Sequence, residues 1–151
     1  MKKLLILFLA FLGLSYTVVA QSTYDEALAK KLGADERGMK KYVMAFLLRG
    51  DRVAEYTPEK RQEIQAGHMA NISKMADMGK LIVAGPFFGN DDLRGIYIFD
   101  VQSIDEAKAL TETDPAIQAG VLKMDLKEWY GSAALMMVNE IHGNIARGSI
   151  Q

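Results

Sequence analysis

His68 is the residue whose type and position best suit proton-transfer chemistry in this sequence. An unperturbed imidazole titrates at roughly pH 6.5, so it can accept and donate protons close to neutrality. The residue lies in segment 57–79, which predicts an amphipathic helix. The apolar residues that share its face at helical spacing are Ile64, Ile72 and Met75. Because a buried polar ring needs a hydrogen-bond partner, His68 is either a general acid/base or a core histidine bonded to a backbone carbonyl.

Other side chains with reactive or ligand-binding groups give weaker evidence of a functional site. The sequence contains two histidines, no cysteine and no HExxH motif, so a metal site near His142 and Glu140 has little support. Ser132 has no nucleophile-elbow context. We expect Gly85 and Pro86 either to shape a pocket wall or to end a strand. Four larger side chains are candidates for contacts to an aromatic or anionic ligand, or for packing and interface contacts: Arg94, Tyr97, Trp129 and Tyr130.

The elements that would position His68 alternate between strands and helices. Thr57 can cap the long helix, Pro58 suits its first position, and Gly79 is a suitable stop. A nearly continuous apolar run, 41–49, predicts a buried strand before that helix. The segments that follow predict a strand, a strand, a helix and a strand: 81–84, 95–100, 103–113 and 122–126.

This order predicts an α+β fold with ferredoxin-like βαββαβ topology and an antiparallel sheet. Two helices can cover only one face of such a four-stranded sheet. The apolar run from Tyr42 to Leu48 nevertheless indicates that both faces of its strand are covered. We therefore expect a second copy of the chain to cover the open face, which predicts a homodimer.

Residues 1–20 have the pattern of a cleaved secretory signal peptide. A basic start precedes an apolar run, 4–14, and Val18-Val19-Ala20 supplies the small residues of a cleavage site. The run is shorter than the roughly 20 residues that span a bilayer, which disfavours the alternative of a membrane anchor. We expect an exported protein, periplasmic or secreted, with no stable membrane anchor after signal cleavage.

The remaining chain is consistent with one domain and two short extensions. Residues 21–39 predict an N-terminal arm with a short helix, 40–131 the ferredoxin-like domain, and 132–151 a C-terminal tail with a possible short helix. The formal net charge of −1 offers no basic footprint for nucleic acid, so we expect no nucleic-acid partner.

Residues 40–135 resemble the YciI-like (YCII-related) family. The pieces that carry the resemblance are, in order, KKYVMAFLLRGD, AGHMANISKMADMGKL, VAGPF, RGIYIFDV, SIDEAKALTETDPAIQAG and EWYGSAAL. No single piece is specific, but their order and spacing together are. The resemblance implies a ferredoxin-like domain that pairs into a dimeric α/β barrel, and one type of family member is associated with dehydrochlorination of a chlorinated hydroxyquinol-type aromatic.

The resemblance also implies a pocket with a histidine and an aspartate as the active-site pair. By position these are His68 and Asp114, the latter in an Asp-Pro pair. The carboxylate would orient the ring and stabilise its cationic form, whereas ordinary turn chemistry before proline is the alternative.

The leading hypothesis is an enzyme that performs His/Asp acid-base chemistry, elimination or isomerisation, on a small organic molecule, without metal or other cofactor. Its expected catalytic residues are His68 and Asp114, and its expected substrate-binding residues are Arg94, Tyr97, Gly85, Pro86 and Trp129. The alternatives are a non-catalytic small-ligand-binding dimeric module, with His68 as an anchor, and a structural dimer that acts through its tail.

Overall fold

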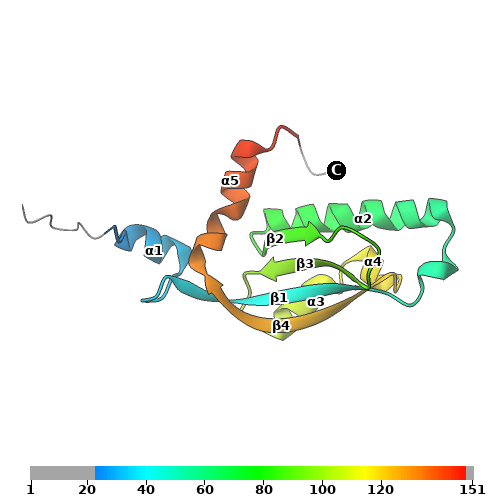
Figure 1. Ribbon diagram of the computed structural model, residues 1–151, viewed down its shortest axis with the longest axis horizontal. Helices are drawn as coiled ribbons and strands as arrows, with labels where there is room; N and C mark the ends of the chain where they lie inside the picture. Colours follow the sequence, from blue (N-terminus) through cyan, green and yellow to red (C-terminus); the bar gives the residue numbers. More distant parts are fainter. Residues whose placement is uncertain (1–22, 149–151) are drawn as a thin grey trace, which may run out of the picture.

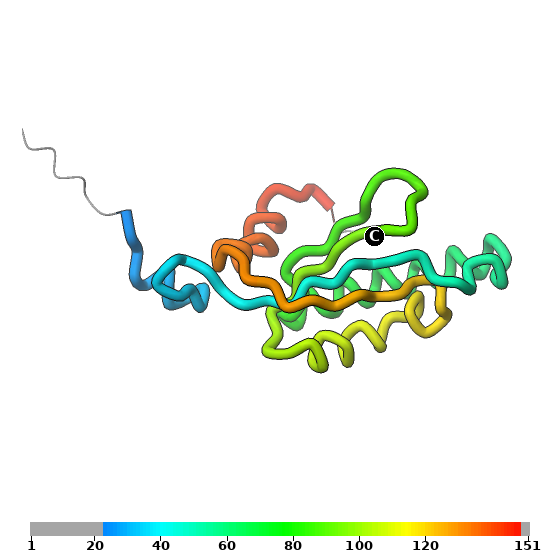
Figure 2. Tube along the Cα trace, turned by 60° about the horizontal axis from the view of Figure 1, so that its bottom comes forward, coloured from blue at the N-terminus to red at the C-terminus, as the bar shows by residue number. Residues whose placement is uncertain are grey.

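A four-stranded antiparallel sheet with the order β2-β3-β1-β4 forms the centre of the computed structural model, which describes residues 23–148 (Figure 1). Its strands are β1 (Met39–Arg49), β2 (Leu81–Pro86), β3 (Leu93–Phe99) and β4 (Leu122–Ser132). Helices α2 (Pro58–Asp77) and α3 (Ile104–Thr111) make the two crossovers and lie on the same face of the sheet (Figure 2). The predicted α+β, ferredoxin-like topology is confirmed. The predicted signal peptide, 1–20, lies outside the described residues.

Helix α2 begins and ends where its sequence predicts. The Thr57 side chain accepts a hydrogen bond from the backbone N–H of Lys60, and Pro58 occupies the first turn. Gly79 has a φ of +67°, and its N–H bonds the carbonyl of Ala76. The residues on the buried face are Ile64, His68, Asn71 and Met75. The amphipathic helix with His68 on its inner face is therefore confirmed.

Strand pairing decides which side chains face α2. Ala45 of β1 pairs with Tyr97 of β3 and with Leu126 of β4, so these three lie on the face covered by the helices. The core on this face consists of Val43, Ala45, Leu47, Met75, Leu81, Tyr97, Phe99, Val101 and Ala107. Tyr97 thus reaches the space beneath His68 from the middle of a core strand.

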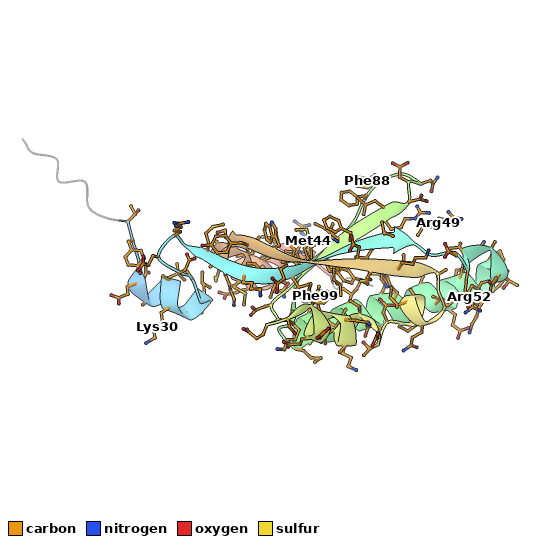
Figure 3. All side chains as sticks on the ribbon, turned by 90° about the horizontal axis from the view of Figure 1, so that it is seen from below. Lys30, Met44, Arg49, Arg52, Phe88 and Phe99 are labelled. Atoms are coloured by element: carbon orange, nitrogen blue, oxygen red, sulfur yellow. The ribbon has the colours of Figure 1, made fainter. Side chains whose placement is uncertain are left out.

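The other face of the sheet is apolar but only partly covered. Its half-buried side chains include Met44, Phe46, Leu48, Val83 and Ile96. Figure 3 shows Met44 on this side and Phe99 on the side of the helices. At one end, Asn139 Nδ2 donates to the carbonyl of Leu81 at 2.9 Å and so ties the C-terminal segment to β2.

Short helices account for the remaining chain: α1 (Glu26–Leu32), η1 (Val53–Glu55), α4 (Pro115–Gln118), η2 (Ala133–Met137) and α5 (Val138–Ile145). α1 ends at Gly33, where φ is +68°. Ile104 is exposed in the first turn of α3, although the apolar residues of this helix were expected to pack against the sheet. Strand β4 continues past the predicted end at Leu126, because its pairing with β1 extends to Ser132. Within the described range, no helix is long and apolar enough to span a membrane.

Candidate functional site

His68 and Asp114 contact each other in the interior, although 46 positions separate them in the sequence. The imidazole Nδ1 lies 2.7 Å from Asp114 Oδ2. The exposed fractions are 7% for His68 and 0% for Asp114. A carboxylate at this distance accepts a hydrogen bond from the Nδ1–H of the ring. The structure therefore brings together the two residues that the family resemblance paired, while their catalytic roles stay a prediction.

The Asp114-Pro115 pair at the start of α4 orients the Asp114 carboxylate toward His68. Asp114 has extended backbone angles, as expected for a residue before proline, and it caps α4. Its Oδ1 accepts the N–H of Ala116 at 2.8 Å, which leaves Oδ2 for His68. The sequence did not predict the short helix α4, which Asp114 begins as its N-cap. The cap holds the carboxylate in one orientation, because both oxygens are engaged.

Close contact between α2 and α4 depends on Gly67. A Cβ at this position would lie 3.0 Å from Cγ and 3.3 Å from Cβ of Pro115. Such distances are tighter than ordinary van der Waals contact between carbon atoms. Gly67, next to His68, therefore allows Pro115, next to Asp114, to approach α2. This approach brings the side chains of His68 and Asp114 into contact.

Tyr97 is the second partner of the imidazole. Its Oη lies 3.3 Å from His68 Nε2, and the two rings stack with 6.3 Å between centroids. Burial raises the pKa of the Tyr97 hydroxyl far above its usual value, and the nearby charge of Asp114 adds to this effect. The hydroxyl therefore keeps its proton, which it can donate to Nε2 when that nitrogen carries none. In that tautomer the ring proton lies on Nδ1, toward Asp114.

Asn71 is a buried polar residue of the site that the sequence reasoning missed. It lies three positions after His68 on the same helix face, so helical spacing could have identified it. Thr113 Oγ1 donates to Asn71 Oδ1 at 3.0 Å. Because Thr113 precedes Asp114, this bond ties the segment that carries the aspartate to α2.

A cavity of about 420 Å³ adjoins the ring of His68 between α2 and the sheet. Five of its lining residues were expected at a site: His68, Gly85, Pro86, Arg94 and Tyr97. Much of the remaining wall is apolar and includes Leu47, Met69, Ile72 and Leu122. This size falls within the range of small-molecule pockets, roughly 300–1,000 Å³. A wider hollow of about 820 Å³ follows the outer flank of α2, but no buried titratable group lines it.

Arg94 lines the cavity at an irregularity of the sheet. The pairing of β1 with β3 shifts between Leu47 and Leu48, and Arg94 is left without a partner in β1. Such a bulge re-aims side chains near the ends of strands. Within residues 23–148, no carboxylate forms an ion pair with Arg94. Its positive charge is therefore not neutralised by a direct partner in the described chain.

Trp129 does not reach this cavity. Its ring lies 5.9 Å from that of Tyr42, to which it is paired across β1 and β4, on the open face of the sheet. Side chains alternate between the faces of a strand, so Trp129 lies opposite the side of Leu126. Tyr130 is also remote, since its hydroxyl bonds the Asp35 carboxylate. The described part of the chain contains no cluster of three or more residues able to hold a metal ion.

Fold and site together define a ferredoxin-like α+β domain with a buried histidine–aspartate pair beside a small-molecule-sized cavity. The chain belongs to the family of the YCII-related domain, whose family model matches residues 42–130. The predicted family membership is confirmed. The terminal segments with α1 and α5 lie outside the matched range.

The known proteins that are similar to this chain include a bacterial relative and a solved structure. The uncharacterized protein YjpA of Bacillus subtilis (strain 168) is 30% identical over 73 residues, which cover 48% of this chain and 84% of YjpA. A solved structure of 5-chloro-2-hydroxyhydroquinone dehydrochlorinase from Burkholderia phenoliruptrix AC1100, in complex with 2,5-dihydroxybenzoquinone, is 21% identical with a TM-score of 0.44. That likeness covers 60% of this chain and 93% of the other.

Proposed function

We propose that this protein is an enzyme in which His68 transfers protons to and from a small organic molecule. The observation that carries the proposal is the buried 2.7 Å contact between His68 Nδ1 and Asp114 Oδ2 at the wall of a cavity. A carboxylate on one ring nitrogen sets the tautomer and leaves the other nitrogen as the base. Elimination or isomerisation is the reaction class, because both begin with abstraction of a proton.

The electrostatics of the pair suit such a step. When Nε2 takes a proton, the ring becomes cationic and faces the Asp114 carboxylate, which stabilises the charge. The mostly apolar wall of the cavity lowers the local dielectric constant, which strengthens this interaction. Arg94 and Tyr97 are the residues we propose to bind the polar end of the substrate, while Gly85 and Pro86 shape the wall.

Proton exchange in heavy water tests this function with model compounds in place of the natural substrate. The full-length chain is incubated with a panel of small carbonyl compounds, and loss of C–H signals is followed by NMR. Enzymatic exchange supports the proposal when it saturates with the compound and stops when the protein is unfolded. Compounds that bind in the cavity but never exchange would contradict it.

A non-catalytic ligand-binding module is the second candidate. The specific observation in its favour is that both nitrogens of His68 already have partners, Asp114 and Tyr97. A histidine bonded in this way can anchor a ligand without exchanging a proton with it. A small molecule retained through purification, together with an absence of proton exchange, would favour the module over the enzyme.

We also propose a homodimer formed through the open face of the sheet. Phe46 and its half-buried neighbours make that face apolar, and Phe88, which is fully exposed, extends from the β2–β3 connection on the same side (Figure 3). Contiguous exposed apolar surface marks interaction sites. A second copy would present the same face, as twofold symmetry requires.

Phe46→Lys is expected to convert the dimer to a monomer, because it places a charge in the centre of the buried interface. Sedimentation velocity at micromolar concentration measures the change. Gln62→Lys, on the exposed surface of α2, is the matched control and should remain dimeric. Sedimentation of the unmodified chain as a monomer would contradict the proposed interface.

Export is a separate proposal that rests on residues 1–20 alone. Expression in a bacterium with a secretory pathway, followed by mass measurement of the mature chain, tests it. A product that keeps residues 1–20 inside the cell would contradict it.

A further inference from the structure

The Tyr97 hydroxyl contacts Nε2 of His68, the nitrogen that acts as the base in the proposed reaction. Oη lies 3.3 Å from His68 Nε2, and Asp114 engages the other nitrogen. Tyr97 also lines the cavity, although its side chain is only 1% exposed. Its ring is held by an edge-to-face contact with Phe99, with 5.7 Å between centroids. Tyr97 is thus fixed in place between the base and the ligand space.

The surroundings of Tyr97 make it a donor and not a base. Burial and the charge of Asp114 both disfavour the phenolate, so they raise the pKa of the hydroxyl. A neutral hydroxyl has one proton to donate, and rotation about its C–O bond can redirect it from Nε2 to another acceptor. A bound oxygen next to Nε2 would receive that hydrogen bond and release the nitrogen to act as the base.

We propose that Tyr97 donates a hydrogen bond to the oxygen anion that forms as His68 takes a proton, and that the substrate is therefore a small compound with a C–H next to a carbonyl. This inference rests on the proposed function and adds the substrate class. In the step, the C–H bond breaks and its proton bonds to Nε2. The freed electron pair forms a C=C bond, and the carbonyl π pair moves to the oxygen, which Tyr97 stabilises.

The second half of the reaction requires no further reactant. In an isomerisation, the enolate collapses to a carbonyl and the conjugate acid of His68 returns the proton to a different carbon. In an elimination, the same electron pair expels a leaving group from the neighbouring carbon, and the proton is released to solvent. Preorganised donors of this kind contribute about 10²–10³ in rate.

A purely structural tyrosine is the alternative. Tyr97 lies in the core beside Ala45 and Phe99, and its ring alone could account for its burial. Such a residue would tolerate phenylalanine without a change in how the site binds an anion. The hydroxyl is therefore the atom to test, and a variant that keeps the ring isolates its effect.

Tyr97→Phe is tested with 4-nitrophenol, whose phenolate mimics the enolate oxygen. We expect the full-length wild-type protein to bind it as the phenolate, which its absorbance reports, and the variant to bind about ten- to hundredfold more weakly, since bonds to charged groups are the stronger ones. Tyr42→Phe is the matched control, because it removes a buried hydroxyl that bonds Ser132 O at 3.0 Å on the other face of the sheet. Thermal unfolding of both variants checks that the fold is intact.

Nitrogen NMR of labelled histidine supplies a second measurement. We expect His68 to carry its proton on Nδ1 in the wild type, and its Nε2 resonance to move toward that of a free imidazole nitrogen in Tyr97→Phe. The exposed His142 is an internal reference. Equal phenolate affinity in the wild type and Tyr97→Phe, or no phenolate binding by the wild type, would overturn the inference. Proton exchange that persists with those results would leave the base role of His68 standing, so the two proposals can fail separately.

Discussion

Asp114→Ala is expected to lower the free energy of unfolding by about 2–6 kcal/mol, because two buried donors lose their acceptor at a cost of about 1–3 kcal/mol each. Asp114 is fully buried and accepts bonds from His68 and from the N–H of Ala116. Alanine leaves both donors without a partner in the interior. Urea denaturation followed by circular dichroism measures the loss, which is large beside a typical stability of about 5–15 kcal/mol.

Three further variants locate the cause of that loss. Asp91→Ala, at an exposed position, should change stability by less than about 0.5 kcal/mol. Asp114→Asn keeps the acceptor for Ala116, so it should lose less than Asp114→Ala. The double variant His68→Leu/Asp114→Ala should regain stability relative to Asp114→Ala, because it also removes the unpaired imidazole. Asp114→Ala that unfolds like Asp91→Ala would show that the pair contributes nothing to the fold.

His68→Gln is expected to reduce proton exchange of an active carbonyl compound by about 10²–10⁴-fold, the usual contribution of a positioned general base. Glutamine approximates the size of the ring and can still bond Tyr97 or Asp114, but it has no nitrogen that titrates near neutral pH. The initial rate of deuterium incorporation, measured across substrate concentrations, separates a loss of kcat from a change of KM. We expect the loss to fall mainly on kcat.

Gln62→Ala is the matched control for this experiment, since Gln62 lies on the exposed side of α2 away from the cavity around His68. Its exchange rate should equal that of the wild type. Circular dichroism and sedimentation confirm that each variant keeps its fold and its assembly. A folded His68→Gln protein with the wild-type rate would exclude His68 as the base, while the cavity would remain available to a binding module.

Local sequence patterns were sufficient to predict the strands and the crossover helices of the domain, and to predict that His68 lies on the buried face of α2. Helical periodicity placed the ring on the buried side, and Thr57 and Gly79 marked the two ends of the helix. Chain order then predicted the ferredoxin-like topology, because few arrangements of these elements can form one antiparallel sheet. The alternation seen from Leu122 to Leu126, extended to Trp129, would also have placed that side chain on the open face.

The partners of His68 were decided only by tertiary structure. Asp114 is 46 positions away and Tyr97 is 29, so neither contact follows from helical or strand spacing. The contact with Asp114 depends on how closely α4 approaches α2, which Gly67 permits, and the contact with Tyr97 depends on the register that places Tyr97 opposite Ala45. Periodicity tells which side of an element is buried, whereas distances between elements arise from packing of all of them at once. That is why periodicity could predict the position of His68, whereas its contact with Asp114 was expected only from the family resemblance and its contact with Tyr97 was not predicted.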